Sequence, residues 1–143
     1  MPFPFRPHGH FSTHVEGRLL VSEVTGPWNR ELVENWGLDC YPQARALSAE
    51  GPYVGIAIIR ESMLCPPDAM LSLRKVAHLS ATRLQCLAHL IVADASVEGR
   101  DFLESTFVKL YDGVIAHRLF PTLDEARAWA RVLLAAQAGK QGS

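Results

Sequence analysis

The middle of the chain holds an apolar run, Val54-Gly55-Ile56-Ala57-Ile58-Ile59, that has no polar side chain and is rich in β-branched residues. Side chains of a strand alternate between its two faces. A strand without a polar position is therefore buried on both faces, as in the centre of a parallel sheet. A sheet of this kind needs helices above and below it. The run predicts an α/β fold with this segment as a central strand.

Four further segments have strand character. The turn residues Glu16-Gly17 join the first two strands into a hairpin, and Gly26-Pro27 ends the second. The predicted strands are residues 11–15, 18–25, 54–59, 86–93 and 114–120.

Four helices are predicted from apolar residues at helical spacing and from the residues that begin each helix. Asn29 is a good N-cap, Pro67 suits a first helical position, and Thr122 with Glu125 matches a capping box. Gly37 and Pro42 indicate that the first helix is either one long irregular helix or two short ones. The predicted helices run from residues 28–31 to about 47, from 67 to about 82, from 101 to 111, and from 123 to about 137.

The order of these elements is β-β-α-β-α-β-α-β-α, which implies right-handed parallel crossovers between the later strands. We predict one domain over residues 1–143. It is a two-layer α/β domain with four helices and a mixed sheet of about five strands, in which an N-terminal hairpin precedes the parallel strands. One core is feasible, because a chain of ~150 residues buries roughly 68–70% of its unfolded surface. Residues 1–9 and 138–143 are expected to be flexible.

The composition excludes several classes of function. The net charge is −1 and no basic block occurs, so nucleic acid is not an expected partner. No apolar run reaches the ~20 residues that a membrane helix needs, so membrane insertion is not expected. The N-terminus has no apolar signal region, and the three cysteines form no CxxC pair. These features predict a cytoplasmic protein without a disulfide framework.

Three stretches resemble a known family. They are the hairpin that runs into GPWNRE at residues 26–31, the strand followed by a helix opening with Pro-Pro-Asp, and AHRLFPTLDEARAWA at residues 116–130. The chain is similar to the STAS domain, the fold of bacterial anti-sigma-factor antagonists, and more closely to small stand-alone bacterial proteins called STAS-like or SEC14-like. The resemblance covers nearly all of residues 10–136 and implies a regulatory role.

The resemblance does not extend to the phospho-switch of the family. In its antagonists, a partner kinase phosphorylates a serine in an Asp-Ser-Ser-Gly-like segment at the start of the second helix. The matching positions here, around residues 64–68, contain no serine or threonine, and Ser62 lies before them. We therefore predict that the switch serine is absent.

Ligand and regulatory sites of open α/β sheets gather at the carboxyl ends of the strands, which points to residues 60–68. Arg60 and Glu61 either line a pocket for a small anion or a partner's side chain, or form an exposed pair. Cys65 precedes a helix N-terminus, where a thiolate would be stabilised and reactive. The alternative for Cys65 is a small apolar side chain that fills space. Ser62 and Asp68 complete this part of the candidate site.

Trp28 and Asn29, at the start of the first helix, extend the candidate binding residues. With Trp36 and Trp129, Trp28 either lines an apolar groove or packs helices onto the sheet. A partly exposed Trp28 would suit a protein contact.

No catalytic residue, metal or cofactor is predicted. His8, His10 and His14 would share one side of an extended chain, but no cysteine or acidic ligand stands at matching spacing. No nucleophile motif or glycine-rich phosphate loop organises the remaining polar residues.

The leading prediction is a non-enzymatic regulatory or protein-interaction module that docks an unidentified protein through residues 60–68 and the neighbouring helix. The alternative is a carrier or sensor of a small apolar, lipid-like ligand, which needs a cavity between helix and sheet. An enzyme would instead need a polar cleft with coupled ionisable groups. A homodimer through sheet edges or helix faces is also expected.

Overall fold

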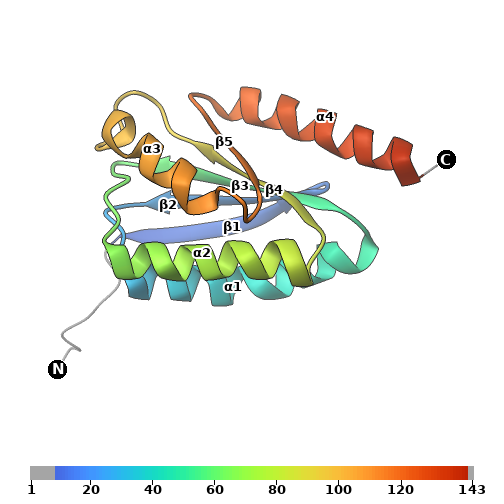
Figure 1. The fold of residues 1–143 in the computed structure, drawn as a ribbon, viewed down its shortest axis with the longest axis horizontal. Coiled ribbons are helices and arrows are strands. Elements are labelled where there is room, and N and C mark those ends of the chain that lie inside the picture. The colour runs from blue at the N-terminus through green and yellow to red at the C-terminus, as the bar shows by residue number, and fades with distance from the viewer. Residues whose placement is uncertain (1–8, 142–143) are drawn as a thin grey trace.

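The structure is a computed structural model that describes residues 9–141. Within them the chain forms five strands and four helices (Figure 1). The strands are β1 (His10–Glu16), β2 (Leu19–Thr25), β3 (Tyr53–Arg60), β4 (Cys86–Val92) and β5 (Ala116–Phe120). The helices are α1 (Arg30–Glu50), α2 (Pro67–Arg83), α3 (Arg100–Tyr111) and α4 (Leu123–Gln141).

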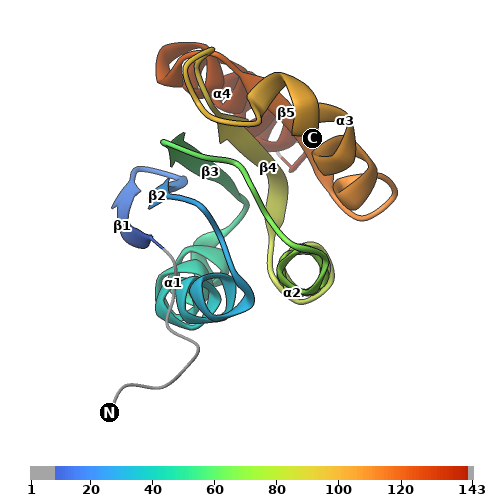
Figure 2. The ribbon, with the colours of Figure 1, turned by 90° about the vertical axis from the view of Figure 1, so that its left-hand side faces the viewer.

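The five strands lie in the sheet in the order of the sequence, from β1 to β5. β1 and β2 are antiparallel, and each later strand is parallel to the one before it. Every parallel connection steps to the next strand in the same direction. Right-handed crossovers that all step one way place their helices on one face. Accordingly, α1, α2 and α3 lie on one side of the sheet, and α4 lies on the other (Figures 1 and 2).

The sheet separates two hydrophobic cores, and β3 contributes to both. Val54, Ile56 and Ile58 pack toward α4, whereas Tyr53 and Ile59 pack toward the three crossover helices. The side chains named here are 6% exposed or less. The central strand is therefore buried on both faces, as its apolar run predicts.

The predicted α/β class, the mixed sheet of five strands and the four helices are confirmed. The expected two layers are in fact three, because α4 covers the second face alone. The C-terminal tail is also corrected: α4 continues through residues 138–141, while residues 1–8 and 142–143 lie outside the described part of the chain. Across residues 9–141, no helix is both long enough and apolar enough to span a membrane.

α1 is one continuous helix although Pro42 stands inside it. Proline has no N–H to donate to the carbonyl four residues earlier, here that of Leu38. Both Leu38 and Pro42 are exposed on the outer side of the helix, so a water molecule can donate the missing hydrogen bond to the Leu38 carbonyl. Of the two alternatives that Gly37 and Pro42 left open, the single long helix is the observed one.

Arg18, in the turn before β2, holds the C-terminal end of α1. Its guanidinium donates to the carbonyls of Leu47, Gly51 and Pro52, with distances of 2.6 Å to Leu47 and 2.9 Å to Pro52. The last turn of α1 contains no basic residue. Because the last carbonyls of a helix lack intrahelical donors and carry partial negative charge, Arg18 supplies both the donors and the charge.

Replacing Arg18 by Met should lower the free energy of unfolding by about 2 kcal/mol, because three charge-assisted hydrogen bonds are lost at a partly exposed site. Arg45→Met is the matched control, since Arg45 is an exposed arginine of α1 that makes no ion pair with the described residues. Urea denaturation of both variants measures the difference. An Arg18→Met protein as stable as Arg45→Met would refute this role.

Candidate functional site

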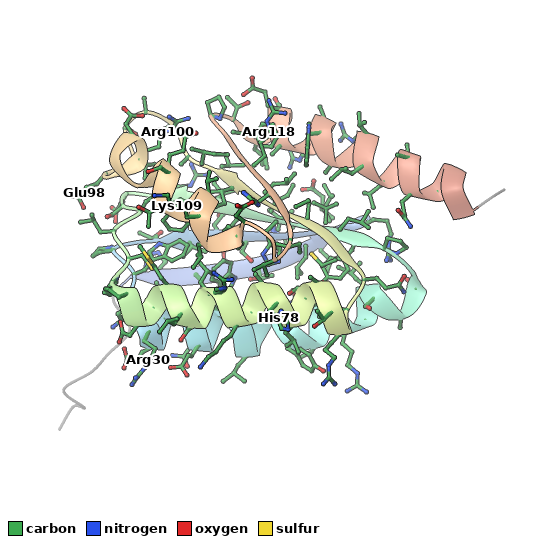
Figure 3. The ribbon with its side chains drawn as sticks, in the orientation of Figure 1. Arg30, His78, Glu98, Arg100, Lys109 and Arg118 are labelled. Atoms are coloured by element: carbon green, nitrogen blue, oxygen red, sulfur yellow. The ribbon has the colours of Figure 1, made fainter. Side chains whose placement is uncertain are left out.

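The predicted segment 60–68 lies at the carboxyl end of the sheet, where its side chains and backbone bind neighbouring loops. The Arg60 guanidinium pairs with the Glu23 carboxylate at 2.8 Å. Ser62 is buried; it donates to Glu98 Oε1 at 2.8 Å and accepts from the Leu64 N–H at 3.1 Å. Glu98 lies at the end of the molecule where α3 begins (Figure 3). Arg60 thus links the ends of β2 and β3, and Ser62 links its loop to the loop before α3.

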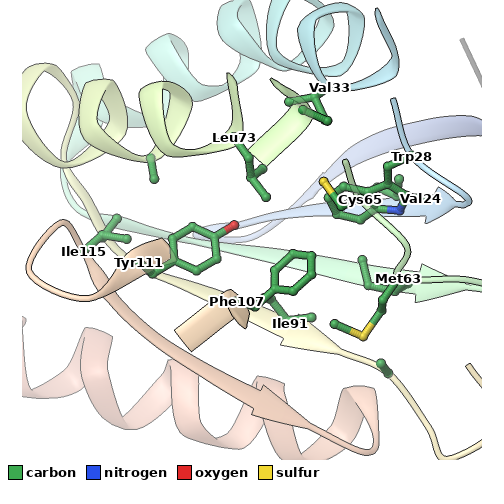
Figure 4. Close-up of a cluster of buried hydrophobic side chains, with 14 of the residues drawn as sticks. Val24, Trp28, Val33, Met63, Cys65, Leu73, Ile91, Phe107, Tyr111 and Ile115 are labelled. Carbon is green, nitrogen blue, oxygen red and sulfur yellow. The ribbon is translucent and has the colours of Figure 1, made fainter. Parts of the chain in front are cut away.

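Cys65 and Trp28 belong to the core between the sheet and helices α1 to α3 (Figure 4). Burial raises the pKa of the Cys65 thiol to about 12, with the nearby Asp68 charge adding to the effect. Both effects favour the protonated thiol, which supports the interpretation of Cys65 as a small apolar side chain that fills space. Trp28 is 3% exposed and packs edge-on against Trp36 and Phe107, so the packing interpretation holds for it.

Of the remaining candidate residues, Asn29 caps a helix, whereas Glu61 and Asp68 lie on the surface. The Asn29 side chain accepts from the Leu32 N–H at 2.9 Å, which confirms it as the N-cap of α1. Glu61 and Asp68 are exposed. Glu61 has a φ of 67°, in the left-handed region that favours glycine, and its carbonyl accepts from the Glu98 N–H at 2.8 Å. The structure therefore brings the predicted residues to one end of the sheet without forming a cleft from them.

A cavity of about 80 Å³ lies elsewhere, between the middle of the sheet and helices α1, α2 and α3. Its wall is mainly apolar. Two small residues of β3, Gly55 and Ala57, face this side of the sheet and leave the space open. The lining residues are Leu20, Ser22, Trp36, Cys40, Gly55, Ile56, Ala57, Leu73, His89, Leu90, Ile91 and Tyr111.

Gly55 allows a close approach between β3 and a side chain of β4. It is paired with His89 of the neighbouring strand, and a Cβ on Gly55 would come within 3.2 Å of His89 Cδ2. This is a tighter approach than side chains normally make. Glycine at this position therefore lets the imidazole lie over the central strand, at the edge of the cavity.

On one wall of the cavity, several polar side chains are linked by hydrogen bonds. The Trp36 indole N–H donates to Ser22 Oγ at 2.9 Å, and Ser22 Oγ lies 2.9 Å from Thr13 Oγ1. Cys40 Sγ lies 3.3 Å from Thr13 Oγ1, and burial raises the pKa of this thiol as well. The donors and acceptors of this wall are largely satisfied by one another.

His89 and Tyr111 form the opposite side of the cavity. Unlike the groups of the first wall, their polar atoms are not satisfied by neighbouring residues that the structure describes. Their rings meet edge to face with centroids 5.7 Å apart, and the ring of His117, the partner of His89 on β5, lies 5.7 Å from Tyr111 at a tilt of 31°. Neither the His89 imidazole nor the Tyr111 hydroxyl makes a hydrogen bond with another described residue. Figure 4 shows the Tyr111 hydroxyl directed into the core. Both side chains can therefore bind a guest in the cavity.

Both groups are uncharged near neutral pH. Burial lowers the pKa of His89 from 6.5 to about 4 and raises the pKa of the Tyr111 hydroxyl. Within the described part of the chain, no Asp, Glu, Lys or Arg lines the cavity. The cavity thus offers hydrogen-bonding groups in an apolar, electrically neutral space.

Sequence reasoning located the loop but missed this cavity. The available signal was the set of small or polar residues on strands that are otherwise apolar: Ser22, Gly55, Ala57 and His89. Their alignment depends on the register between β3 and β4, which shifts between Tyr53 and Gly55 and brings Gly55 beside His89. Periodicity within each strand does not reveal that register.

Among the described residues, no group of three or more His, Cys, Asp or Glu side chains is arranged to hold a metal ion. His8 lies outside the described residues. Comparison with protein-family models, with curated proteins and with solved structures finds no match. The resemblance to STAS-like proteins therefore stays a prediction.

The partly buried His89, with its lowered pKa, should make stability depend on pH. The unfolded chain takes up this proton near pH 6.5 but the folded chain only near pH 4. The free energy of unfolding should therefore fall as the pH drops through this window, by up to about 3 kcal/mol. His89→Gln should remove this part of the slope in urea denaturation at several pH values. His78→Gln, at an exposed position of α2, is the control and should keep it.

The same slope in the His89→Gln and wild-type proteins would contradict the burial of a neutral imidazole.

Proposed function

We propose that this chain is a non-enzymatic regulatory module that binds one small, uncharged molecule in the cavity between the sheet and helices α1, α2 and α3. The observation that carries the proposal is an apolar cavity faced by the imidazole of His89 and the hydroxyl of Tyr111, neither of which makes a hydrogen bond with another described residue. A guest with a polar group would bind them. Of the two sequence-based functions, the sensor or carrier has this support.

The energetics favour a guest with a polar group. A guest that shields His89 and Tyr111 from water without pairing with them leaves polar groups unsatisfied at roughly 1–3 kcal/mol each, whereas a hydrogen-bonding guest avoids this cost. A water molecule needs at least ~10–15 Å³ of such volume. At about 80 Å³, this cavity has room for several waters or a small organic molecule.

Size and charge define the class of ligand. A dry cavity of roughly 150 Å³ takes up benzene, so this cavity suits a guest somewhat smaller than a benzene ring, or a ring after slight expansion. A long acyl chain exceeds that space, which narrows the lipid-like alternative to small molecules. An ionised guest would lose its hydration without gaining a counter-charge. The proposed ligand is therefore neutral, with an apolar body and one group that accepts or donates a hydrogen bond.

A regulatory role follows from where the cavity lies. Its wall includes Trp36 of α1, Leu73 of α2 and Tyr111 of α3. A ligand that contacts all three would favour the arrangement in which they close around it. Because a ligand shifts a conformational equilibrium only through differential contacts, the relative positions of these helices are the property that it would change.

The ionisation of the cavity supports a binding role over catalysis. A general acid or base works best with a pKa near the operating pH. Burial moves the pKa of His89 down to about 4 and that of Tyr111 further above its ordinary value. The three free cysteines support a reducing, cytoplasmic setting.

Docking of a protein through residues 60–68 is the second candidate. Glu61, Leu64 and Asp68 are exposed there, with Leu64 42% exposed. The left-handed backbone of Glu61 fixes the loop in one shape, and such conformations often occur at functional sites. This surface would recognise a partner without any ligand in the core.

The ligand-binding proposal is tested by titrating the ¹⁵N-labelled protein with a set of small neutral phenols, alcohols and amides. At least one should shift the amide signals of Gly55, Ala57, His89 and Tyr111. Ala57→Leu, which fills the cavity, should abolish these shifts. Tyr111→Phe should weaken binding about 5–10-fold through the loss of one hydrogen bond.

Tyr53→Phe is the matched control, because Tyr53 is equally buried on the same face but does not line the cavity. It should bind like the wild-type protein. Titration shifts confined to residues 60–68, or shifts that persist in Ala57→Leu, would overturn the cavity as the site.

A further inference from the structure

The outer side of α2 carries an open, basic groove. It is lined by Leu71, Arg74, Lys75, His78, Leu79, Thr82, Arg83, Gly113 and Val114. Among the residues that the structure describes, no carboxylate lines it. Arg74, Lys75 and Arg83 are exposed, and none of them is in an ion pair with a described residue. His78 marks this side of α2 in Figure 3.

Apolar side chains accompany these cations. Leu71 is 61% exposed and Leu79 is 41% exposed, both on α2. On the neighbouring α1, Leu38 is 75% exposed and Tyr41 is 42% exposed. Exposed leucines are common singly, but four large apolar side chains on two adjacent helices form a surface that favours association.

The two helices pack side by side and carry opposite charge. Figure 2 shows α1 and α2 together below the sheet, and a Cβ added to Gly37 of α1 would meet Val76 of α2 at 3.2 Å. α1 contains four acidic and two basic residues, a net charge of −2. α2 contains one acidic and three basic residues, a net charge of +2.

The acidic helix has the pattern that the groove would accept. Glu34, Leu38 and Tyr41 are spaced so that they share one side of α1. All three are exposed. The stripe presents the Glu34 carboxylate, which pairs at 3.2 Å with the exposed Arg30 of the same helix, followed by two apolar side chains; a partner's lysine can compete for this exposed carboxylate, and the apolar side chains complement the leucines of the groove on α2.

We propose that the occupant of this groove is α1 of a second copy of the chain, in a two-fold symmetric dimer. In such an interface the same surface serves both partners, so that α1 of each protomer meets α2 of the other. The chain carries both complementary halves on adjacent helices of one face. A two-fold axis between the two protomers therefore forms two equivalent α1–α2 contacts at once.

The size of a typical dimer interface sets how much of this chain's surface must be covered. A standard interface buries ~800 Å² per partner, about a tenth of the 7999 Å² surface of this chain. The face lies on the outer side of the helices that enclose the cavity. Dimerisation does not depend on a ligand there, so its failure would leave the proposed function untouched.

The test is sedimentation velocity of the full chain over a range of protein concentrations. The wild-type protein should dimerise, and the dissociation constant should rise with salt because the attraction is partly ionic. Glu34→Lys and Lys75→Glu should each weaken the dimer at least tenfold, since each places like charges across both halves of the interface. An equimolar mixture of the two variants should restore a heterodimer, in which every α1–α2 contact again joins opposite charges.

The mixture separates the proposal from a simple folding defect, because a misfolded variant would not recover on mixing. Arg131→Glu, on the exposed face of α4 across the sheet, is the charge control and should dimerise like the wild-type protein. Leu38→Ser should weaken the dimer, whereas Val132→Ser should not, although Val132 is 67% exposed on α4.

A wild-type monomer at all concentrations would overturn the proposal and leave the groove to a partner of another kind. Dimers that form equally well in Glu34→Lys and Lys75→Glu would overturn it too, as would variants that fail to pair when mixed.

Discussion

The whole structure depends on the burial of β3 on both faces. A strand in this position must have partners at both edges and helices over both faces. The parallel order of the strands provides three helices on one side through right-handed crossovers, and α4 provides the cover on the other. The ion pair between Arg127 of α4 and Glu16 of β1, with both N–O distances at 2.8 Å, links this cover to the edge of the sheet.

The two faces of β3 are filled differently, and the cavity follows from that difference. Toward α4, Val54, Ile56 and Ile58 fill the space with branched side chains. Toward the other helices, Gly55 and Ala57 stand between the larger Tyr53 and Ile59. Large side chains at the two ends of the strand hold the helices off the sheet, and the small residues between them leave room that His89 and Tyr111 only partly occupy.

The sequence predicts the local structure well because local chemistry decides it. Asn29 caps α1, Pro67 begins α2, and Thr122 with Glu125 begins α4, each as expected. The contacts of Arg18 with α1 and the pairing of Gly55 with His89 join residues far apart in the chain, and no local pattern predicts them. Fold geometry alone predicts the loop 60–68 as a site. In the structure, Cys65 and Trp28 are packing residues, because this end of the sheet is buried more deeply than the polar residues near it suggest.

The central claim is that the core of this protein holds a small neutral molecule. Native mass spectrometry of the chain purified from its own host, compared with the same sample after denaturation, tests it most directly. We predict an added mass of one small molecule that disappears on denaturation and is absent from an Ala57→Leu chain prepared in the same way. A bare wild-type chain, or an added mass that the Ala57→Leu chain retains, would contradict the account.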